Sequence, residues 1–316
     1  MLDIFIKRQS TNVLVMELIM PLLHLVKQLY GSHDQQQLYE RVQSLLKNRL
    51  LKVKDYPRTN VNTDELFDLL EEVNKFAEKC NDPELCNLAG EVSIFIVKVI
   101  LGNNIKKETT STPSKKSKSP KKTETPAASN VAGAVPNYDE KIVKRLSKFY
   151  GGLLEKFMTK NHTNLRPGQF TIVIQRYPMV AWEFVDELVS YLSPKPLAHA
   201  NQIVMKVFQL TQAYRFLEIL FNTLSKQEEE KHMKKVKSLI PKINQAQAEV
   251  CEAYQDTVNG KEEDNKKMTK ISQPRLKEIT KSLNNISRKV KKMMKEDDKY
   301  VIDTTAINNL RATKQK

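Results

Sequence analysis

Two clusters of lysine and arginine are the side chains of this sequence whose chemistry is easiest to identify. The first cluster consists of Lys115, Lys116, Lys118, Lys121 and Lys122. The second consists of Arg288, Lys289, Lys291 and Lys292. Nuclear import receptors and nucleic acids both bind clustered cations, and contact with phosphates is salt-sensitive and independent of base sequence. Both clusters therefore predict nuclear import or weak contact with RNA or DNA, against the simpler alternative of a solvated basic segment.

Ser119 lies inside the first cluster and is followed by Pro120, which fits a proline-directed phosphorylation site. A phosphate at Ser119 would add a charge of about −1.5 to −2 beside the lysines. We expect that charge to weaken the hold of the cluster on an acidic partner.

No catalytic set accompanies these cations. The 5 histidines are not spaced at i and i+4, and none has a cysteine or aspartate nearby at zinc-ligand spacing. The sequence also lacks a glycine-rich phosphate loop and a nucleophile elbow. We therefore expect no enzyme activity, no cofactor and no metal, and the 3 cysteines are expected to be reduced thiols of an intracellular protein.

The elements that must carry the clusters are predicted to be helices. Residues 12–30 are apolar on nearly every side, as in the inner helix of a stack, and Pro21 should kink it. Glu17, His24 and Lys27 interrupt this stretch, which argues against a membrane span. Residues 35–52 form its amphipathic partner.

Further helices are predicted in pairs with short turns. Asn62 to Glu65 is a capping signal that opens a helix, and residues 83–101 form its partner. The run from Ser93 to Leu101 favours a strand by propensity, but we interpret it as a buried helix because no second strand is in sight. Later helices are expected at 138–160, 167–175, 177–192, 197–224 and 227–254.

The chain divides into four segments by composition. Residues 1–103 and 138–260 read as helical repeats, and the first is expected to continue a missing N-terminal part. Residues 104–137 are rich in lysine, serine and proline and are predicted to be a disordered linker. Residues 261–316 form a basic tail. Of the net charge of +15, the linker carries +5 and the tail carries +8, so most of the excess is expected in unfolded or peripheral segments.

The tail contains one amphipathic helix, predicted over residues 277–295. Its apolar positions recur about every 3.5 residues, and lysines fill the opposite face. The pattern leaves two alternatives open: a free helix that docks on a partner or on nucleic acid, and a helix that folds back on the body. The whole chain is thus predicted to be all-α, an irregular α-solenoid of helix pairs of the HEAT or armadillo kind.

Several stretches resemble the C-terminal portion of the Myb-binding protein 1A and DNA polymerase phi (DNA polymerase V) family. They are Leu2 to Gln9, Val13 to Leu23, Leu153 to Lys160 and Phe170 to Pro178. The resemblance covers about residues 1–225 and consists of helix-core motifs. It implies a nucleolar and nuclear scaffold built of helical repeats, with transcription factors and pre-ribosomal proteins as partners. It also implies roles in ribosomal RNA gene transcription, ribosome biogenesis and transcription co-regulation.

Two other functions compete with this scaffold. The first is a nuclear transport or ribosome-assembly adaptor, which is also a solenoid but has different partners. The second is a polymerase, as the family name suggests, but two-metal catalysis requires paired aspartates. The nearest polymerase-like stretch, Tyr30 to Asp34, lacks them and lies in a predicted turn between helices.

Overall fold

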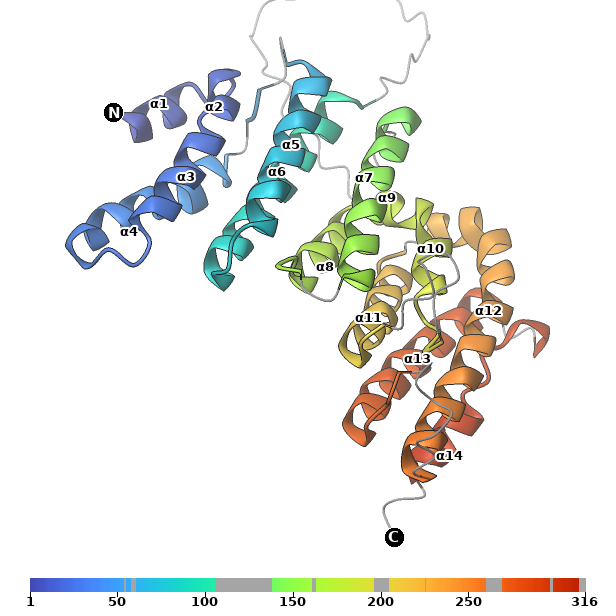
Figure 1. Ribbon diagram of the computed structural model, residues 1–316. Coiled ribbons are helices and arrows are strands. Elements are labelled where there is room, and N and C mark those ends of the chain that lie inside the picture. The colour runs from blue at the N-terminus through green and yellow to red at the C-terminus, as the bar shows by residue number, and fades with distance from the viewer. Residues whose placement is uncertain are drawn as a thin grey trace, which may run out of the picture.

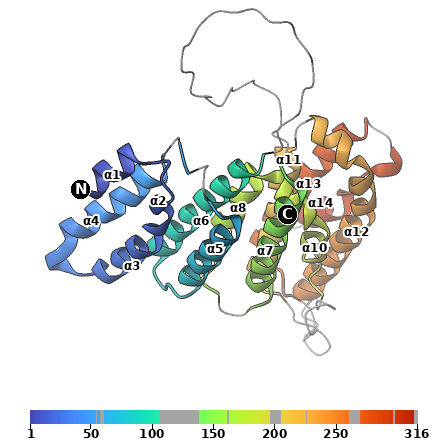
Figure 2. The ribbon, with the colours of Figure 1, turned by 90° about the horizontal axis from the view of Figure 1, so that it is seen from above.

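The computed structural model describes residues 1–53, 55–57, 61–105, 138–160, 163–195, 205–224, 226–259, 269–295 and 298–312. Within these residues the regular elements are helices, and the only strand-like pairing is an isolated antiparallel bridge between Ile105 and Tyr138. The helices stand side by side in an elongated stack from the N-terminal to the C-terminal end (Figures 1 and 2). The prediction of an all-α solenoid of helix pairs is confirmed.

The first unit of the stack contains the short helices of residues 2–50. They are α1 (Leu2–Arg8), α2 (Leu14–Glu17), α3 (Ile19–Leu29), the 3-10 turn η1 (His33–Gln35), α4 (Gln36–Ser44) and the π-helical turn η2 (Leu45–Leu50). The predicted inner helix is therefore divided at Leu18. Pro21 explains the division, because its ring nitrogen cannot donate to the carbonyl of Glu17, where α2 ends.

The following helices build two layers. They are α5 (Thr63–Glu78), α6 (Pro83–Asn103), α7 (Glu140–Thr159), α8 (Pro167–Arg176), α9 (Pro178–Glu183), α10 (Val185–Ser190), α11 (Val207–Thr223), α12 (Lys226–Asn259), α13 (Gln273–Met293), the 3-10 turn η3 (Asp298–Tyr300) and α14 (Thr305–Ala312). In one layer α3, α6, α8, α11 and α13 each contact the next, and α5, α7, α9, α10 and α12 pack against this row. Such layering buries one face of every helix against its neighbours.

Side-chain caps set the beginnings of three of these helices. The Asn62 side chain accepts a hydrogen bond from the backbone N–H of Asp64 (3.0 Å), as the capping signal predicts. Asp82 accepts from the N–H groups of Glu84 and Leu85 at 2.8 and 2.9 Å and so caps α6. Asp139 caps α7 in the same way.

Helix α6 is long and strongly apolar. It is long and apolar enough to cross a membrane by length and composition, yet 78% of its most apolar window is buried inside the structure. Helices α3, α5, α7 and α8 cover it. The β-branched run from Ser93 to Leu101 is helical, as interpreted from the sequence, because packing on every side outweighs its strand propensity.

A buried polar network ties α5, α6 and α7 together. The Asn74 amide donates to the Leu70 carbonyl at 2.7 Å and to the Ser93 hydroxyl at 3.1 Å. The Ser93 hydroxyl also lies 3.1 Å from the Tyr150 hydroxyl. Because an unpaired buried hydroxyl or amide costs about 1–3 kcal/mol, this network favours one relative placement of the three helices.

The C-terminal segment is part of the stack rather than a peripheral tail. Helix α13 packs on α11, α12 and α14, and its apolar stripe is buried. The stripe comprises Leu276, Ile279, Leu283, Ile286, Val290 and Met293. Of the two alternatives that the sequence leaves open, the structure shows the helix folded back on the body. The excess positive charge of residues 269–295 therefore lies on an ordered surface.

Tyr177 gives the stack a predicted dependence on alkaline pH. It joins α8 to α9, and burial raises the pKa of its hydroxyl from 10.0 to about 12. The neutral phenol is thus favoured in the folded state, so its contribution is complete below pH 10.0 and is lost as the pH rises toward 12. Between pH 10 and 12 the parent should lose about 2–3 kcal/mol of its free energy of unfolding through Tyr177, and we expect Tyr177→Phe to abolish this loss.

Urea unfolding at successive pH values, followed by circular dichroism, measures that difference. The free energies of unfolding of the variant and the parent should run parallel below pH 10.0 and converge or cross above it. Parallel curves up to pH 12 would show that Tyr177 is ionised as easily in the folded state as in the unfolded chain.

Candidate functional site

The structure places the second predicted cation cluster on the solvent side of α13. Arg288, Lys291 and Lys292 are exposed. Lys289 is half-buried, and its Nζ donates to the Leu224 carbonyl oxygen at 3.4 Å, so it also closes the C-terminal end of α11. Three of the four predicted residues are thus available to a ligand, and the fourth contributes to the packing of α13 on α11.

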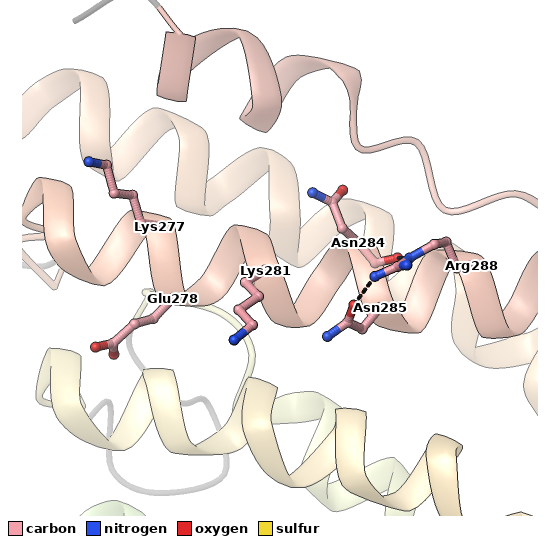
Figure 3. Close-up of a pocket in the computed structure, with 6 residues that line it drawn as sticks. All are labelled: Lys277, Glu278, Lys281, Asn284, Asn285 and Arg288. Atoms are coloured by element: carbon pink, nitrogen blue, oxygen red, sulfur yellow. Dashed lines mark hydrogen bonds between the residues drawn. The ribbon is translucent and has the colours of Figure 1, made fainter. Parts of the chain in front are cut away.

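A groove of about 410 Å³ runs along the same side of α13 (Figure 3). It is lined by Lys277, Glu278, Lys281, Asn284, Asn285 and Arg288. Asn285 reaches α11, and Asn284 reaches α14. The groove therefore lies on a helix that is held on both sides, and it extends the predicted cation cluster toward the N-terminal end of α13.

The guanidinium of Arg288 is oriented by its neighbours. Its Nη2 donates to the Asn285 side-chain oxygen, and its Nε donates to the Asn284 carbonyl oxygen at 3.4 Å (Figure 3). The Asn285 amide donates in turn to Glu218 of α11, whose other carboxylate oxygen accepts from Ser282 at 2.6 Å. Glu218 and Asn285 were not predicted from the sequence, because only the packing of α11 on α13 brings them together.

A second candidate surface surrounds α7. One groove of about 540 Å³ lies between α5 and α7, and another of about 570 Å³ lies between α7 and the α9–α10 segment. Lys148, Gly152 and Glu155 line both. An added Cβ at Gly152 would meet no atom within 4 Å, so the helix backbone is open to an approaching partner there.

Charge on this surface is mixed and partly paired. Lys156 lies 3.0 Å from Glu78, and Lys75 lies 2.7 Å from Glu71. Lys148 and Glu155 carry unlike charges about two turns apart on the same side of α7. Alternating charges beside a hollow are typical of protein-binding surfaces, where they determine orientation and partner choice.

The first predicted cluster lies outside the described residues. This holds for Lys115, Lys116, Lys118, Lys121 and Lys122, for the possible phosphorylation site Ser119, and for residues 106–137 of the predicted linker. The prediction that they serve import or nucleic-acid contact therefore stays a prediction.

Groups that could support catalysis are dispersed where the structure describes them. Among those residues no three His, Cys, Asp or Glu side chains form a metal-binding group. Cys80, Cys86 and Cys251 are buried free thiols, and burial raises the pKa of the Cys251 thiol to about 11. A thiol with a raised pKa is a poor nucleophile near neutral pH.

A two-layer row of helix pairs with surface grooves defines the class of α-solenoid scaffolds, which act by holding other molecules on their helix faces. The family described as Myb-binding protein 1A-like, TPR repeats, matches residues 9–309. The chain belongs to this family, as the resemblance implied. No curated protein and no solved structure matches it. The family description assigns the helix pairs to TPR repeats, a helix-turn-helix repeat class other than the HEAT or armadillo kind.

Proposed function

We propose that the chain is a non-enzymatic scaffold of the nucleus and nucleolus that binds transcription factors and pre-ribosomal proteins during ribosomal RNA gene transcription and ribosome biogenesis. Membership of the Myb-binding protein 1A-like family supports this proposal. The observation that carries the docking mechanism is the pair of grooves that share Lys148, Gly152 and Glu155 on α7.

Gly152→Arg tests the docking surface without disturbing the buried core. Space is open around Gly152, and replacing a glycine inside a helix favours the helix, so the fold should persist. The arginine side chain would project from the residue that both grooves share and would obstruct a partner that approaches there. Gly168→Arg is the matched control, because Gly168 is also an exposed helical glycine with open space, on α8 and away from the α7 grooves.

Tagged full-length variants would be purified from cells after nuclease treatment, and their partners identified by mass spectrometry. We expect transcription factors and pre-ribosomal proteins to be lost from Gly152→Arg and retained by Gly168→Arg. Equal recovery with both variants would rule out the α7 grooves as the docking site. Recovery of transport receptors or late assembly factors alone would favour an adaptor instead.

Nuclear import is proposed for the lysines of residues 115–122. Replacing Lys115, Lys116, Lys118, Lys121 and Lys122 by alanine should shift a fluorescent fusion from the nucleus to the cytoplasm, and Ser119→Glu should shift it part of the way. Unchanged nuclear accumulation of the alanine variant would show that another segment directs import. The second cluster on α13 is proposed to contact RNA or DNA weakly through phosphates.

A further inference from the structure

Helices α11 and α13 lie side by side in parallel and in register. The Arg275 guanidinium lies 6.0 Å from the centre of the Phe208 ring at their N-terminal ends. Glu218 contacts Ser282 in the middle, and Leu224 contacts Lys289 at their C-terminal ends. Exposed residues of the two helices therefore form one continuous surface, which we call the α11/α13 face.

Cations dominate the α11/α13 face. Those on α13 that are exposed are Lys277, Lys281, Arg288, Lys291 and Lys292, and α11 adds the exposed Arg215. From Lys277 to Lys292 the helix rises about 22 Å. Wherever the structure is described, the lysines of this set have no ion-pair partner.

The acids of the α11/α13 face are already engaged. Glu218 accepts from Ser282 and Asn285, and Glu278 lies 2.8 Å from Arg275. Elsewhere in the stack cations are commonly paired across helices, as Lys235 and Lys242 are with Asp186. Because the carboxylates of the face are already bound within the protein, the unpaired lysines can be neutralised only by a negatively charged partner.

The α11/α13 face also carries an exposed aromatic ring. Phe208 is 42% exposed at the start of α11, and the Arg275 guanidinium lies over its ring. An exposed ring next to arginine is a stacking platform for an unpaired base. Arg288, oriented by Asn285, presents its remaining N–H donors to solvent in the geometry that a phosphate binds.

The packing of α13 excludes one mode of duplex recognition. A major groove is about 12 Å wide and admits a single helix. Helix α13 is bounded by α11 on one side and by α14 on the other, where Asn284 and Asn308 exchange side-chain hydrogen bonds of 3.0 and 3.2 Å. It cannot enter such a groove, whereas a single strand can lie along its surface.

We propose that the α11/α13 face binds single-stranded nucleic acid, with phosphates along the α13 cations and a base stacked on Phe208. This inference deepens the nucleic-acid part of the proposed function and is independent of protein docking on α7.

Fluorescence anisotropy with a labelled oligouridylate of about 15 nucleotides tests the proposal. The background is the full chain with Lys115, Lys116, Lys118, Lys121 and Lys122 replaced by alanine, so that they contribute nothing. The α13 variant carries Lys277→Ala, Lys281→Ala, Lys291→Ala and Lys292→Ala. The matched control removes the same charge at four other exposed lysines outside both the α7 grooves and the α11/α13 face, Lys79, Lys141, Lys231 and Lys234.

We expect the α13 variant to bind at least about tenfold more weakly, with a salt slope reduced by about 0.7 for each phosphate that is no longer neutralised. The control should stay within about twofold of the parent. Phe208→Leu keeps an apolar side chain but removes the ring, and it should weaken binding about fivefold without changing the slope. Asn285→Ala, which leaves the charge unchanged, should also weaken binding because Arg288 is then no longer held in its orientation.

Four outcomes would overturn the proposal. Equal weakening in the α13 variant and its control would assign binding to total charge. If a duplex binds as tightly as the single strand, and Phe208→Leu leaves the affinity unchanged, Phe208 is not a stacking site for a base. Binding to phosphatidylserine vesicles but to no oligonucleotide would make the face a membrane contact. No binding of any nucleic acid, while Gly152→Arg still loses its protein partners, would refute this inference and leave the scaffold intact.

Discussion

The Ile286→Asp variant should lose the folded structure of the C-terminal end of the stack. Ile286 is fully buried on α13, which packs on α11, α12 and α14. The new carboxylate would have no described basic partner on the buried stripe of α13, and an unpaired buried charge costs several kcal/mol. We expect a destabilisation of at least about 4 kcal/mol, with α13 and α14 unfolding first, because repeats unfold in neighbouring groups.

Circular dichroism and limited proteolysis measure this loss, and Trp182, the single tryptophan, reports whether the change extends to α9. Arg288→Asp is the control, because it introduces the same carboxylate side chain on the exposed side of the same helix, two residues away. If both variants retain the parent's helix content and melting temperature, α13 does not pack on the stack and is a peripheral tail.

Trp182→Ala should cost about 3–5 kcal/mol, the range for truncating a buried aromatic residue. Trp182 is 2% exposed, and its ring packs 6.0 Å from Phe221 of α11 and 4.5 Å from His232 of α12. Its backbone carbonyl also accepts a hydrogen bond from Lys235. Removing the ring would therefore leave a cavity where three helices meet.

Trp182→Phe provides the informative comparison. The indole Nε1 is buried without a hydrogen-bond partner among the described residues, so phenylalanine removes an unsatisfied donor as well as some contact area. We expect this variant to lose less than about 1.5 kcal/mol in urea unfolding. Equal losses in the two variants would mean that a phenyl ring restores none of the packing that the indole provides.

Much of the fold could be predicted from apolar periodicity and capping residues. The helix that begins after Asn62 and the buried helix that contains Ser93 are both observed. Periodicity was less reliable for the surface that each helix buries. In residues 35–52 the apolar spacing puts Leu38 on one stripe with Val42 and Leu46. In the structure Leu38 is 48% exposed and Tyr39 is buried instead. A short helix offers few positions from which to determine a face, so one residue of error changes the stripe.

The limits of helix α11 show a second reason for error. The sequence pattern predicted one helix over residues 197–224. Residues 197–204 lie outside the described residues, Met205 and Lys206 are not helical, and α11 begins at Val207. Apolar residues before Val207 fit the helical period, but periodicity alone does not determine where a helix starts. Boundaries of this kind depend on the neighbouring helices, here α8 and α13, which no single stretch of sequence reveals.

The candidate site was predicted in part. The cations of residues 288–292 were recognised from composition, but their lysine content suggested an unpacked tail. The apolar residues Leu283 and Ile286, which are buried in the structure, did not by themselves show that the helix packs on the body. Glu218, Phe208 and Asn285 became part of the α11/α13 face only through the parallel packing of helices that are separated by about 65 residues in the chain. Sequence spacing predicts neighbours within one helix, but not across two.

The apolar character of α6 has a consequence for biosynthesis. Helix α8 contacts α6 but is completed about 70 residues later, which corresponds to about 4–15 seconds of translation at ordinary rates. During that interval an apolar helix long enough to span a bilayer emerges from the ribosome before the helices that later cover it. We therefore expect the nascent chain to depend on chaperones, and depleting them should send newly made protein into aggregates before any mature molecule is affected.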